Sequence, residues 1–335
     1  MKEAYHIVSD GSCDLPPELA GEKNITVVPF YVSFGNEDYL KETKEIGVRE
    51  FYQKMVDEPG VYPKSSMPSA QDFADVFEPL VKAGVPVICI CITTKFSGSM
   101  QSALNAKQML LEEYPKAQIA VMDAAVNTVL QGLLVLEAVR LRDNGRSYEE
   151  TIKRLEEIKG TGRIFFTVGG IEYLKHGGRI GKVAGVAGSV LGIRPIITLK
   201  QGEIFPSGIG RSRRKTVDKT IELLLEYLKE QKADIKDYSI AVGFGYDEGE
   251  GEEYRNRLLA ALREKGYSIS GIPLIRLVRP SAYTQDHILL EWALYKRPCK
   301  AEIYAPRRWK KAGEKSWERH YLTQAFHSSF ILSKV

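Results

Sequence analysis

Cysteine is scarce in this sequence, and the patterns that would place the chain in a special class of protein are missing. Four cysteines in 335 residues are too few for a disulfide-stabilised scaffold. No run approaches the ~20 apolar residues of a membrane-spanning helix, and residues 1–12 contain no long apolar segment of the secretory type. Basic and acidic residues nearly balance, 47 against 43, which excludes a chain built mainly to coat nucleic acid. We therefore expect a reduced, cytoplasmic protein without a nucleic-acid partner.

Signatures of enzyme active sites are also missing. The segment GGRIGK at 177–182 resembles a phosphate-binding P-loop, but it is one residue short, and Val183 stands where Ser or Thr would bind magnesium. The segment GFG at 243–245 is followed by an acidic run at 247–250, which would repel a pyrophosphate. The five histidines have no metal-ligand or catalytic-triad spacing. The sequence therefore predicts no catalytic residue, no metal and no cofactor.

In the first half, short apolar runs alternate with amphipathic segments. The predicted strands are residues 5–9, 25–34, 85–92 and 118–123, and the predicted helices are 48–57, 70–83, 102–113, 126–143 and 148–159. Cys89 and Cys91 lie in the third strand and are expected to be buried there as small apolar residues. Ser69 with Asp72, and Ser147, are expected to cap helices. This alternation predicts an α/β domain with a mostly parallel sheet covered by helices on both faces.

Beyond about residue 160 the pattern changes to local hairpins mixed with helices. The predicted strands are 163–168, 193–200, 203–207, 238–244 and 272–278, and the predicted helices are 216–231 and 251–265. Gln201-Gly202 is a plausible hairpin turn. We therefore predict a two-domain protein, with an N-terminal α/β domain over 1–160 and a C-terminal α+β domain with a mixed or antiparallel sheet over 161–280.

Two clusters of hydroxyl side chains, at 64–69 and 93–99, each precede a predicted helix. Open α/β sheets bind anionic ligands at the carboxyl ends of strands and the amino ends of helices. Helix capping explains either cluster alone, but finding both makes a ligand site an equally good interpretation. Arg179, in a glycine-rich stretch, could hold a carboxylate with its planar guanidinium, or could simply be a surface arginine. One alternative for the function is a regulatory or enzymatic α/β protein that binds a small anionic, phosphorylated metabolite at this site.

Arg211, Arg213 and Arg214 form a basic run with Lys215 at the start of the predicted helix 216–231. A charge run is usually a solvated face, but cations are disfavoured at the amino end of a helix. The run therefore suggests an acidic partner.

Five ordered segments resemble sequence motifs of the DegV family. The segment VSDGSCDLP at 8–16 resembles the family's SDSTCDLP, and SSMPS at 65–69 resembles TSQPS. The remaining three are SGSMQSA at 97–103, similar to SGTYQSA, LKHGGRI at 174–180, similar to LxKGGRI, and GIRPI at 192–196, similar to GIKPI. Five motifs in the right order leave little room for chance.

The resemblance implies a carrier and not an enzyme. Such a protein would bury a long-chain fatty acid and present its carboxylate to the catalytic subunit of a fatty acid kinase, which makes acyl phosphate. By resemblance, Ser65 (with Ser66 adjacent) and Ser97 hydrogen-bond the carboxylate, and Arg179 supports the same site. We expect Ser99 to cap the following helix instead.

The resemblance also bears on partners. The basic run resembles a stretch that contributes to kinase docking, which assigns Arg211, Arg213 and Arg214 to the partner surface. A transient contact with a membrane surface is compatible with a carrier of fatty acids.

The sequence departs from the family near residue 280. Relatives carry a His-Thr-Gly-Pro-Gly-like segment after their final strand, where this chain has SAYTQDH at 281–287. Tyr283 can donate a hydrogen bond there, but it is neutral and cannot replace the charge of a histidine. Codons for AYTQDH, read from the third base of the alanine codon, can spell Ile-His-Thr-Gly-Pro. We therefore predict a shift of the reading frame near residue 280, with true divergence as the alternative.

The segment 281–335 is basic and aromatic without clear periodicity, and it includes RRWKK at 307–311. We expect it to be a poorly ordered tail. A contact with a partner or an anionic surface is the alternative. A frame shift would leave the carboxylate site in place and impair transfer to the kinase.

Overall fold

The first half of the chain forms a 4-stranded parallel sheet, as predicted. The computed structural model describes residues 4–35, 37–58, 60–168, 176–178, 194–277 and, as backbone, 290–296. The sheet has the order β2-β1-β6-β7, formed by β1 (His6–Asp10), β2 (Ile25–Val28), β6 (Val87–Cys91) and β7 (Ile119–Asp123). Side chains alternate across it, because Ile88 and Ile90 of β6 pack in one apolar cluster and Cys89 and Cys91 in another. The prediction that both cysteines are buried on a strand is confirmed.

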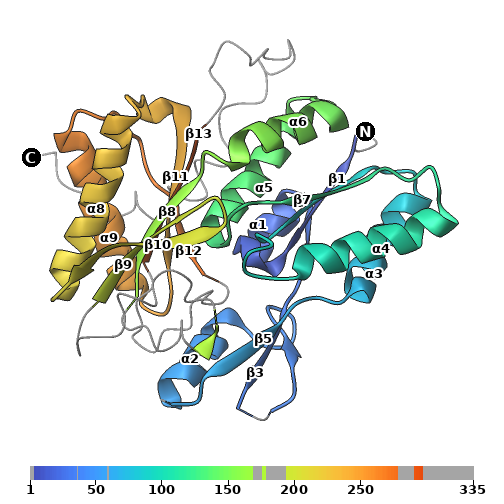
Figure 1. Cartoon of the computed structure of the whole chain (residues 1–335), viewed down its shortest axis with the longest axis horizontal. Coiled ribbons are helices and arrows are strands. Elements are labelled where there is room, and N and C mark those ends of the chain that lie inside the picture. Colours follow the sequence, from blue (N-terminus) through green and yellow to red (C-terminus); the bar gives the residue numbers. More distant parts are fainter. Residues whose placement is uncertain are drawn as a thin grey trace, which may run out of the picture. The chain divides into compact units, whose positions relative to one another are not determined.

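Helices cover both faces of this sheet (Figure 1). One face of the sheet packs against α3 (Ala70–Lys82) and α4 (Ser99–Glu113). The other helices of this half are η1 (Gly11–Cys13), α1 (Pro17–Glu22), α5 (Thr128–Asp143) and α6 (Tyr148–Lys159). The predicted caps are confirmed, since Ser69 caps α3 in a box with Asp72 and Ser147 caps α6. None of the helices in the described part of the chain combines the length and hydropathy needed to cross a bilayer.

The second sheet has six strands and is mostly antiparallel, as predicted for the C-terminal half. Its order is β10-β9-β8-β13-β11-β12, formed by β8 (Arg163–Thr167), β9 (Arg194–Lys200), β10 (Glu203–Gly210), β11 (Tyr238–Phe244), β12 (Leu274–Arg276) and β13 (Leu290–Lys296). The predicted hairpin turn is confirmed, because Gln201 and Gly202 both have positive φ, 51° and 76°, between β9 and β10. Helices α8 (Arg213–Glu230) and α9 (Glu248–Glu264) pack on this sheet, and η3 (Ile235–Asp237) precedes β11.

Helix α5 lies between the two sheets. It contacts β1 and β6 of the parallel sheet and β11 and β13 of the other. Its residues are buried almost all round, which is typical of a helix with apolar surface on both sides. A single apolar cluster includes Ile90 from the first sheet, Leu134 from α5 and Ala241 from the second sheet. The two sheets therefore share a core within the compact unit Met1–Arg297, and a domain boundary at residue 160 stays a prediction.

The prediction of one strand over 25–34 is wrong. Pro29, which lacks a backbone N–H, separates β2 from β3 (Tyr31–Phe34), and β3 belongs to another sheet. That sheet has three strands in the order β4-β3-β5, with β4 (Leu40–Lys41) and β5 (Pro63–Ser66). It packs with α2 (Val48–Asp57) around a small core of its own that contains Val32, Phe34 and Phe51.

The predicted tail over 281–335 begins too early, because the structure has a strand, β13, within it. Its backbone pairs with β8 on one side and with β11 on the other, inside the second sheet. Residues 290–296 therefore belong to the fold and not to a poorly ordered tail. Residues 281–289 and 297–335, with Tyr283, lie outside the described residues.

Gly132 allows α5 to approach the loop after β1. A Cβ atom at this position would lie 2.4 Å from the carbonyl oxygen of Cys13, whereas a Cβ at Gly21 in α1 would meet nothing within 4 Å. We expect Gly132→Ala to destabilise the protein by about 1–3 kcal/mol, because backbone atoms would have to move. The matched variant Gly21→Ala should be neutral or stabilise by about 0.4–1 kcal/mol. Urea unfolding measures both, and equal stabilities would contradict the close contact.

Candidate functional site

Loop 92–98 follows β6 at the carboxyl edge of the parallel sheet and leads into α4. Its first part is fixed by the end of β7, since the Thr94 hydroxyl donates to Oδ2 of Asp123 at 2.8 Å. Its last part contains Ser97, whose Oγ accepts the backbone N–H of Ser99 at 3.2 Å. Ser97 is partly exposed. A hydroxyl whose oxygen is engaged in this way can donate its proton outward.

Ser99 does not cap α4, contrary to the prediction. It is the first residue of the helix, Gly98 is the N-cap, and the Ser99 side chain is buried. Its hydroxyl donates to Oδ2 of Asp10 at 2.7 Å. Sequence reasoning missed Asp10, which ends β1; the acidic residue among small residues directly after a predicted strand was the available signal.

Ser65 and Ser66 lie on strand β5 and not in a loop before a helix. In the pairing of β3 with β5, Ser65 is opposite the buried Val32, and Ser66 is opposite Tyr31. Directly paired residues share a face and neighbours along a strand alternate, so the two serines lie on opposite faces of the sheet. Both are exposed. At most one of them can therefore contact a given ligand group.

The structure brings the two hydroxyl clusters together. A Cβ atom on Gly98 would lie 2.8 Å from Sδ of Met67, the residue that follows β5. The segment after Ser66 therefore packs directly on the segment after Ser97. A side chain at residue 98 would displace only the flexible end of the exposed Met67 side chain.

The glycine-rich motif also reaches this region. Arg179 itself lies outside the described residues, but His176, three positions earlier, stacks on Tyr62 with ring centroids 3.7 Å apart. Tyr62 directly precedes β5. On the other side, a Cβ on Gly202 of the β9–β10 turn would lie 2.4 Å from Oγ1 of Thr93. The glycine-rich motif therefore contacts the start of β5, and the β9–β10 turn contacts the start of the loop that carries Ser97.

Asp72 holds the three-stranded sheet against the start of α3. It accepts hydrogen bonds from the Tyr31 hydroxyl at 2.8 Å and from Nζ of Lys41 at 3.2 Å. Partial burial opposes ionisation of Asp72, but bonds from Ser69, Tyr31 and Lys41 outweigh it and lower its pKa to about 2. This carboxylate therefore stays charged over the whole physiological pH range.

Tyr246 fixes the same sheet and α2 to the C-terminal half. The tyrosine hydroxyl donates to Oε1 of Gln53 at 2.8 Å, and its carbonyl oxygen accepts from Arg49 at 3.0 Å. The Arg49 guanidinium also stacks over the Tyr246 ring. These contacts attach α2, which packs on the three-stranded sheet, to the C-terminal half.

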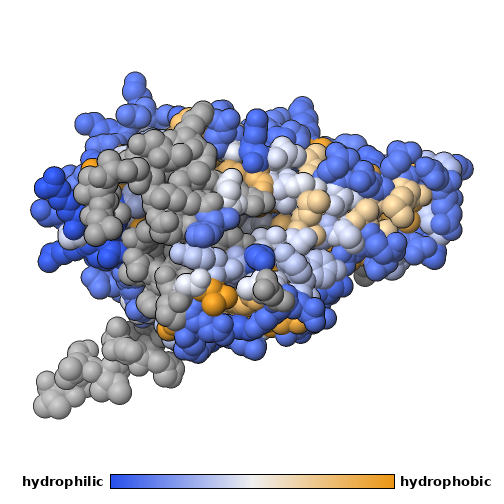
Figure 2. All heavy atoms as spheres, turned by 60° about the horizontal axis from the view of Figure 1, so that its bottom comes forward, coloured by the Kyte–Doolittle hydropathy of each residue, from blue (hydrophilic) through white to orange (hydrophobic). Residues whose placement is uncertain are grey.

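The surface around the three-stranded sheet carries exposed apolar side chains. Tyr39, Leu40 and Met67 are exposed, and all three belong to β4 or lie beside β4 or β5. Figure 2 shows that apolar residues on this face form separate patches among hydrophilic ones.

The basic run divides into paired and exposed residues. Arg213 is the first residue of α8, and its Nε donates to Oε1 of Glu250 at 2.5 Å. Burial disfavours the charged form of both side chains, and it therefore lowers the pKa of Arg213 and raises the pKa of Glu250. Arg211 and Arg214 are exposed. Of the three arginines, only these two present their charge to solvent, and Lys215 beside them is also exposed.

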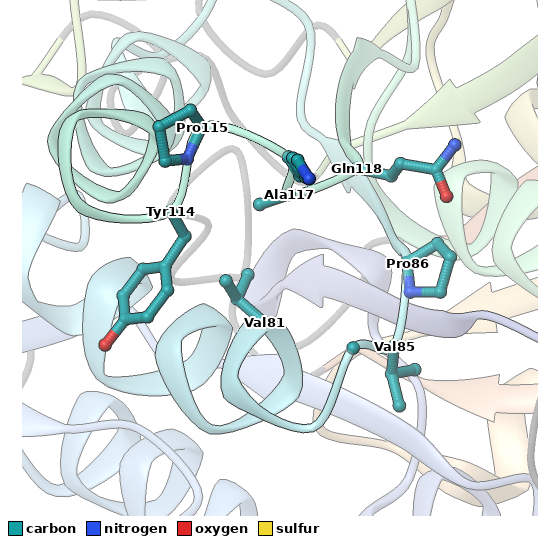
Figure 3. Close-up of a pocket in the computed structure, with 9 residues that line it drawn as sticks. Val81, Val85, Pro86, Tyr114, Pro115, Ala117 and Gln118 are labelled. Carbon is teal, nitrogen blue, oxygen red and sulfur yellow. The ribbon is translucent and has the colours of Figure 1, made fainter.

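A pocket of about 390 Å³ lies at the opposite edge of the parallel sheet (Figure 3). Its walls come from the ends of α3 and α4 and from the residues that precede β6 and β7, including Val81, Pro86, Tyr114 and Gln118. The candidate site lies at the carboxyl ends of these strands. The pocket is therefore separate from the serine clusters.

Comparison with known proteins agrees with the motifs at this edge. The family model described as "Uncharacterised protein, DegV family" matches residues 4–278. A DegV domain-containing protein of Clostridium acetobutylicum is 33% identical over 223 residues, which cover 67% of this chain and 77% of the relative.

Solved structures are similar over most of the chain. A fat acid (stearic acid)-binding protein from Eubacterium ventriosum is 39% identical, with a TM-score of 0.79, and the match covers 88% of this chain and 98% of that one. A fatty-acid-binding DegV family protein from Thermus thermophilus is 27% identical, with a TM-score of 0.74, over 87% and 99% of the two chains. Sequence, fold and the arrangement of motifs agree, and the chain belongs to the DegV family.

Proposed function

We propose that this protein binds a long-chain fatty acid and presents its carboxylate to a separate, ATP-dependent kinase subunit. The proposal rests on one observation, the contact between Met67 and Gly98. This contact places the strand with Ser65 and Ser66 beside the loop with Ser97. The 39% identity to a stearic-acid-binding protein over 88% of the chain supports it. In this proposal the protein is a carrier and the phosphoryl transfer occurs on its partner.

The chemistry of a fatty acid fits a protein that binds the ligand and leaves the phosphoryl transfer to its partner. Burial of an acyl chain contributes about 0.8 kcal/mol per methylene, so a long chain supplies most of the affinity. The carboxylate needs donors, because a buried charge without partners is costly. We assign this role to Ser97 and to Ser65, with Arg179 as the supporting cation. Ser65 and Ser66 lie on opposite faces of β5, and of the two we propose Ser65, the residue that the family resemblance favours.

Native mass spectrometry after mild extraction tests the ligand. A co-purified long-chain acid of defined mass supports the proposal. A bound polar, phosphorylated metabolite would favour a metabolite-binding protein instead, and an empty protein after growth with added fatty acids would contradict binding.

We propose that the kinase approaches the exposed arginines of the basic run. The double variant Arg211→Glu/Arg214→Glu should bind fatty acid like the wild type but slow acyl-phosphate formation by about 10-fold at low salt, because electrostatic steering is lost. The wild-type rate should fall with ionic strength. Steady-state phosphorylation assays with the kinase subunit and ATP measure both effects.

The matched control is Lys229→Glu/Lys232→Glu, which makes the same change in charge with exposed residues at and just beyond the other end of α8. An equal loss of rate in the control would indicate a general charge effect and would remove the docking assignment. Arg213 is left unchanged, because the loss of its ion pair with Glu250 would affect stability.

We also propose that the protein contacts a membrane surface while it takes up its fatty acid. We place this contact at the exposed side chains of Tyr39, Leu40 and Met67.

We also propose that the reading frame shifts near residue 280, so that the family's histidine is missing. Residues 290–296 lie beyond this point and still pair as β13 inside the second sheet, so the proposed shift did not prevent that strand from forming. Resequencing of the gene together with the intact protein mass decides this. A confirmed in-frame sequence with strong hydrogen-exchange protection beyond residue 297 would contradict it and make Tyr283 a site candidate.

A further inference from the structure

Asp10 is a buried carboxylate that connects four segments of the parallel sheet and its helices. It has no exposed surface. Its Oδ1 accepts from the backbone N–H of Ser12 at 3.2 Å and from the Gln131 amide at 2.8 Å. Its Oδ2 accepts from the backbone N–H of Ile92 at 3.0 Å and from the Ser99 hydroxyl at 2.7 Å. Each oxygen therefore serves donors from two different segments, which fixes the plane of the carboxylate.

The hydrogen bonds of Ser99 connect Asp10 to the proposed head-group site. Ser99 begins α4, and its backbone N–H donates to Oγ of Ser97, two residues earlier. The residue between them is Gly98, which has no side chain to restrict its backbone and makes no side-chain cap. The hydroxyl of Ser97 is thus positioned by Ser99, and Ser99 is held by Asp10.

Gln131 supports the carboxylate from α5. Its amide nitrogen reaches both Asp10 and, at 3.0 Å, Oγ of Ser9, which in turn donates to the carbonyl oxygen of Ile90. Gln131 is fully buried on a helix that is otherwise mostly apolar. A polar side chain in such a place is costly unless it is used. Its bonds join α5 to the ends of β1 and β6 at the level of the Ser97 loop.

We propose that Asp10 is a positioning residue for the ligand carboxylate, which acts through Ser99 to aim the Ser97 hydroxyl at the head group. This inference rests on the proposed function and adds to it a residue that does not touch the ligand. The carboxylate is required and an amide does not replace it, because donors face both of its oxygens. An asparagine would place its NH₂ group against one of these donor pairs.

Affinity for an acid and for its neutral ester separates positioning from general stability. We would titrate sodium stearate and methyl stearate against the wild type and the variants Ser97→Ala, Ser99→Ala, Ser99→Thr, Asp10→Asn and Ser97→Ala/Ser99→Ala. Loss of a hydrogen bond to the charged head group should weaken stearate binding by about 10- to 100-fold in Ser97→Ala. Ser99→Ala and Asp10→Asn should lose a similar factor, and all three should change methyl stearate binding much less.

Two further results are expected if the residues act in series. The double variant should be no weaker for stearate than Ser97→Ala alone, because its second substitution removes a link that no longer matters. Ser99→Thr should retain stearate affinity, since it keeps the hydroxyl and matches the Ser-Gly-Thr pattern of the family. Ser99→Ala keeps the experiment decisive if Asp10→Asn does not fold.

Three outcomes would overturn the inference. Equal losses for acid and ester in Ser99→Ala would indicate a structural role only. A loss in Ser97→Ala with full affinity in Ser99→Ala would show that Ser97 needs no anchor. A wild type that binds neither compound would contradict the proposed function itself, and the inference with it.

Discussion

A chain that ends at residue 289 should not fold, whereas a chain that ends at residue 297 should fold and unfold like the full-length protein. The difference between them is β13, which pairs with β8 and β11 inside the second sheet. Its removal leaves β8 paired only with β9 and β11 paired only with β12, so each gains one unpaired edge, and it removes the contacts of β13 with α5. Unpaired edges inside a sheet expose rows of backbone donors and acceptors, which favour aggregation.

Soluble yield, circular dichroism and thermal unfolding of the two truncated chains measure this effect. The shorter chain should be insoluble or lack a cooperative transition. The longer chain is the matched control, because it ends where the compact unit ends, at Arg297. If both chains unfold at the same temperature, β13 does not contribute to the fold and the sheet order is wrong.

Affinity should rise steeply with the length of the acyl chain. Stearic and lauric acids differ by six methylenes, so at about 0.8 kcal/mol for each the binding free energies should differ by about 5 kcal/mol. That difference corresponds to roughly 3,000- to 4,000-fold in the dissociation constant. The gradient should end at the length where the chain fills its binding site. Isothermal titration with a series of saturated acids, each below its aggregation concentration, measures it.

Inorganic phosphate and a short acid such as butyrate are the controls. Both should compete with stearate only at very high concentration, because they offer a negative charge without apolar surface. An affinity that is independent of chain length, with strong competition by phosphate, would contradict a fatty-acid carrier and favour a site for a small phosphorylated metabolite.

The parallel sheet was predictable because its strands carry a direct signal. Buried β-branched residues in β2 and β6 alternate with amphipathic helices at regular spacing, and a sheet covered on both faces requires this pattern. The hairpin turn at Gln201-Gly202 was predictable for the same local reason. These elements depend on neighbours in sequence.

The three-stranded sheet and β13 were not predictable, because long-range pairing produces them. Strand β5 has the sequence PKSS, whose propensity favours a turn, and it is a strand only because β3 lies beside it. The position of β13 is likewise set by β8 and β11, whose edges it joins. The split at Pro29 could have been read from the sequence, since proline is rare inside strands.

The candidate site was partly predictable. Ser97 was found from its hydroxyl-rich loop and from family resemblance, and its loop lies at the expected edge of the sheet. The roles of Ser65 and Ser66 could not be separated without the pairing register, which puts them on opposite faces. Asp10 and Gln131 are 121 positions apart, so no local sequence pattern predicts the hydrogen bond between their side chains. The contact depends on how α5 packs across the ends of β1 and β6.

The position of β13 also sets an order of events during synthesis. The parallel sheet is complete once β7 has been made, at Asp123, so this part can assemble while the ribosome is still translating the rest. The second sheet cannot close at that time, since β8 and β11 must wait with a gap between them until residues 290–296 emerge. Pairing across such a long separation is slow, because the intervening chain must be ordered first. The nascent protein therefore spends the end of its synthesis with one finished half and one open sheet, and during that interval a chaperone has the most to protect.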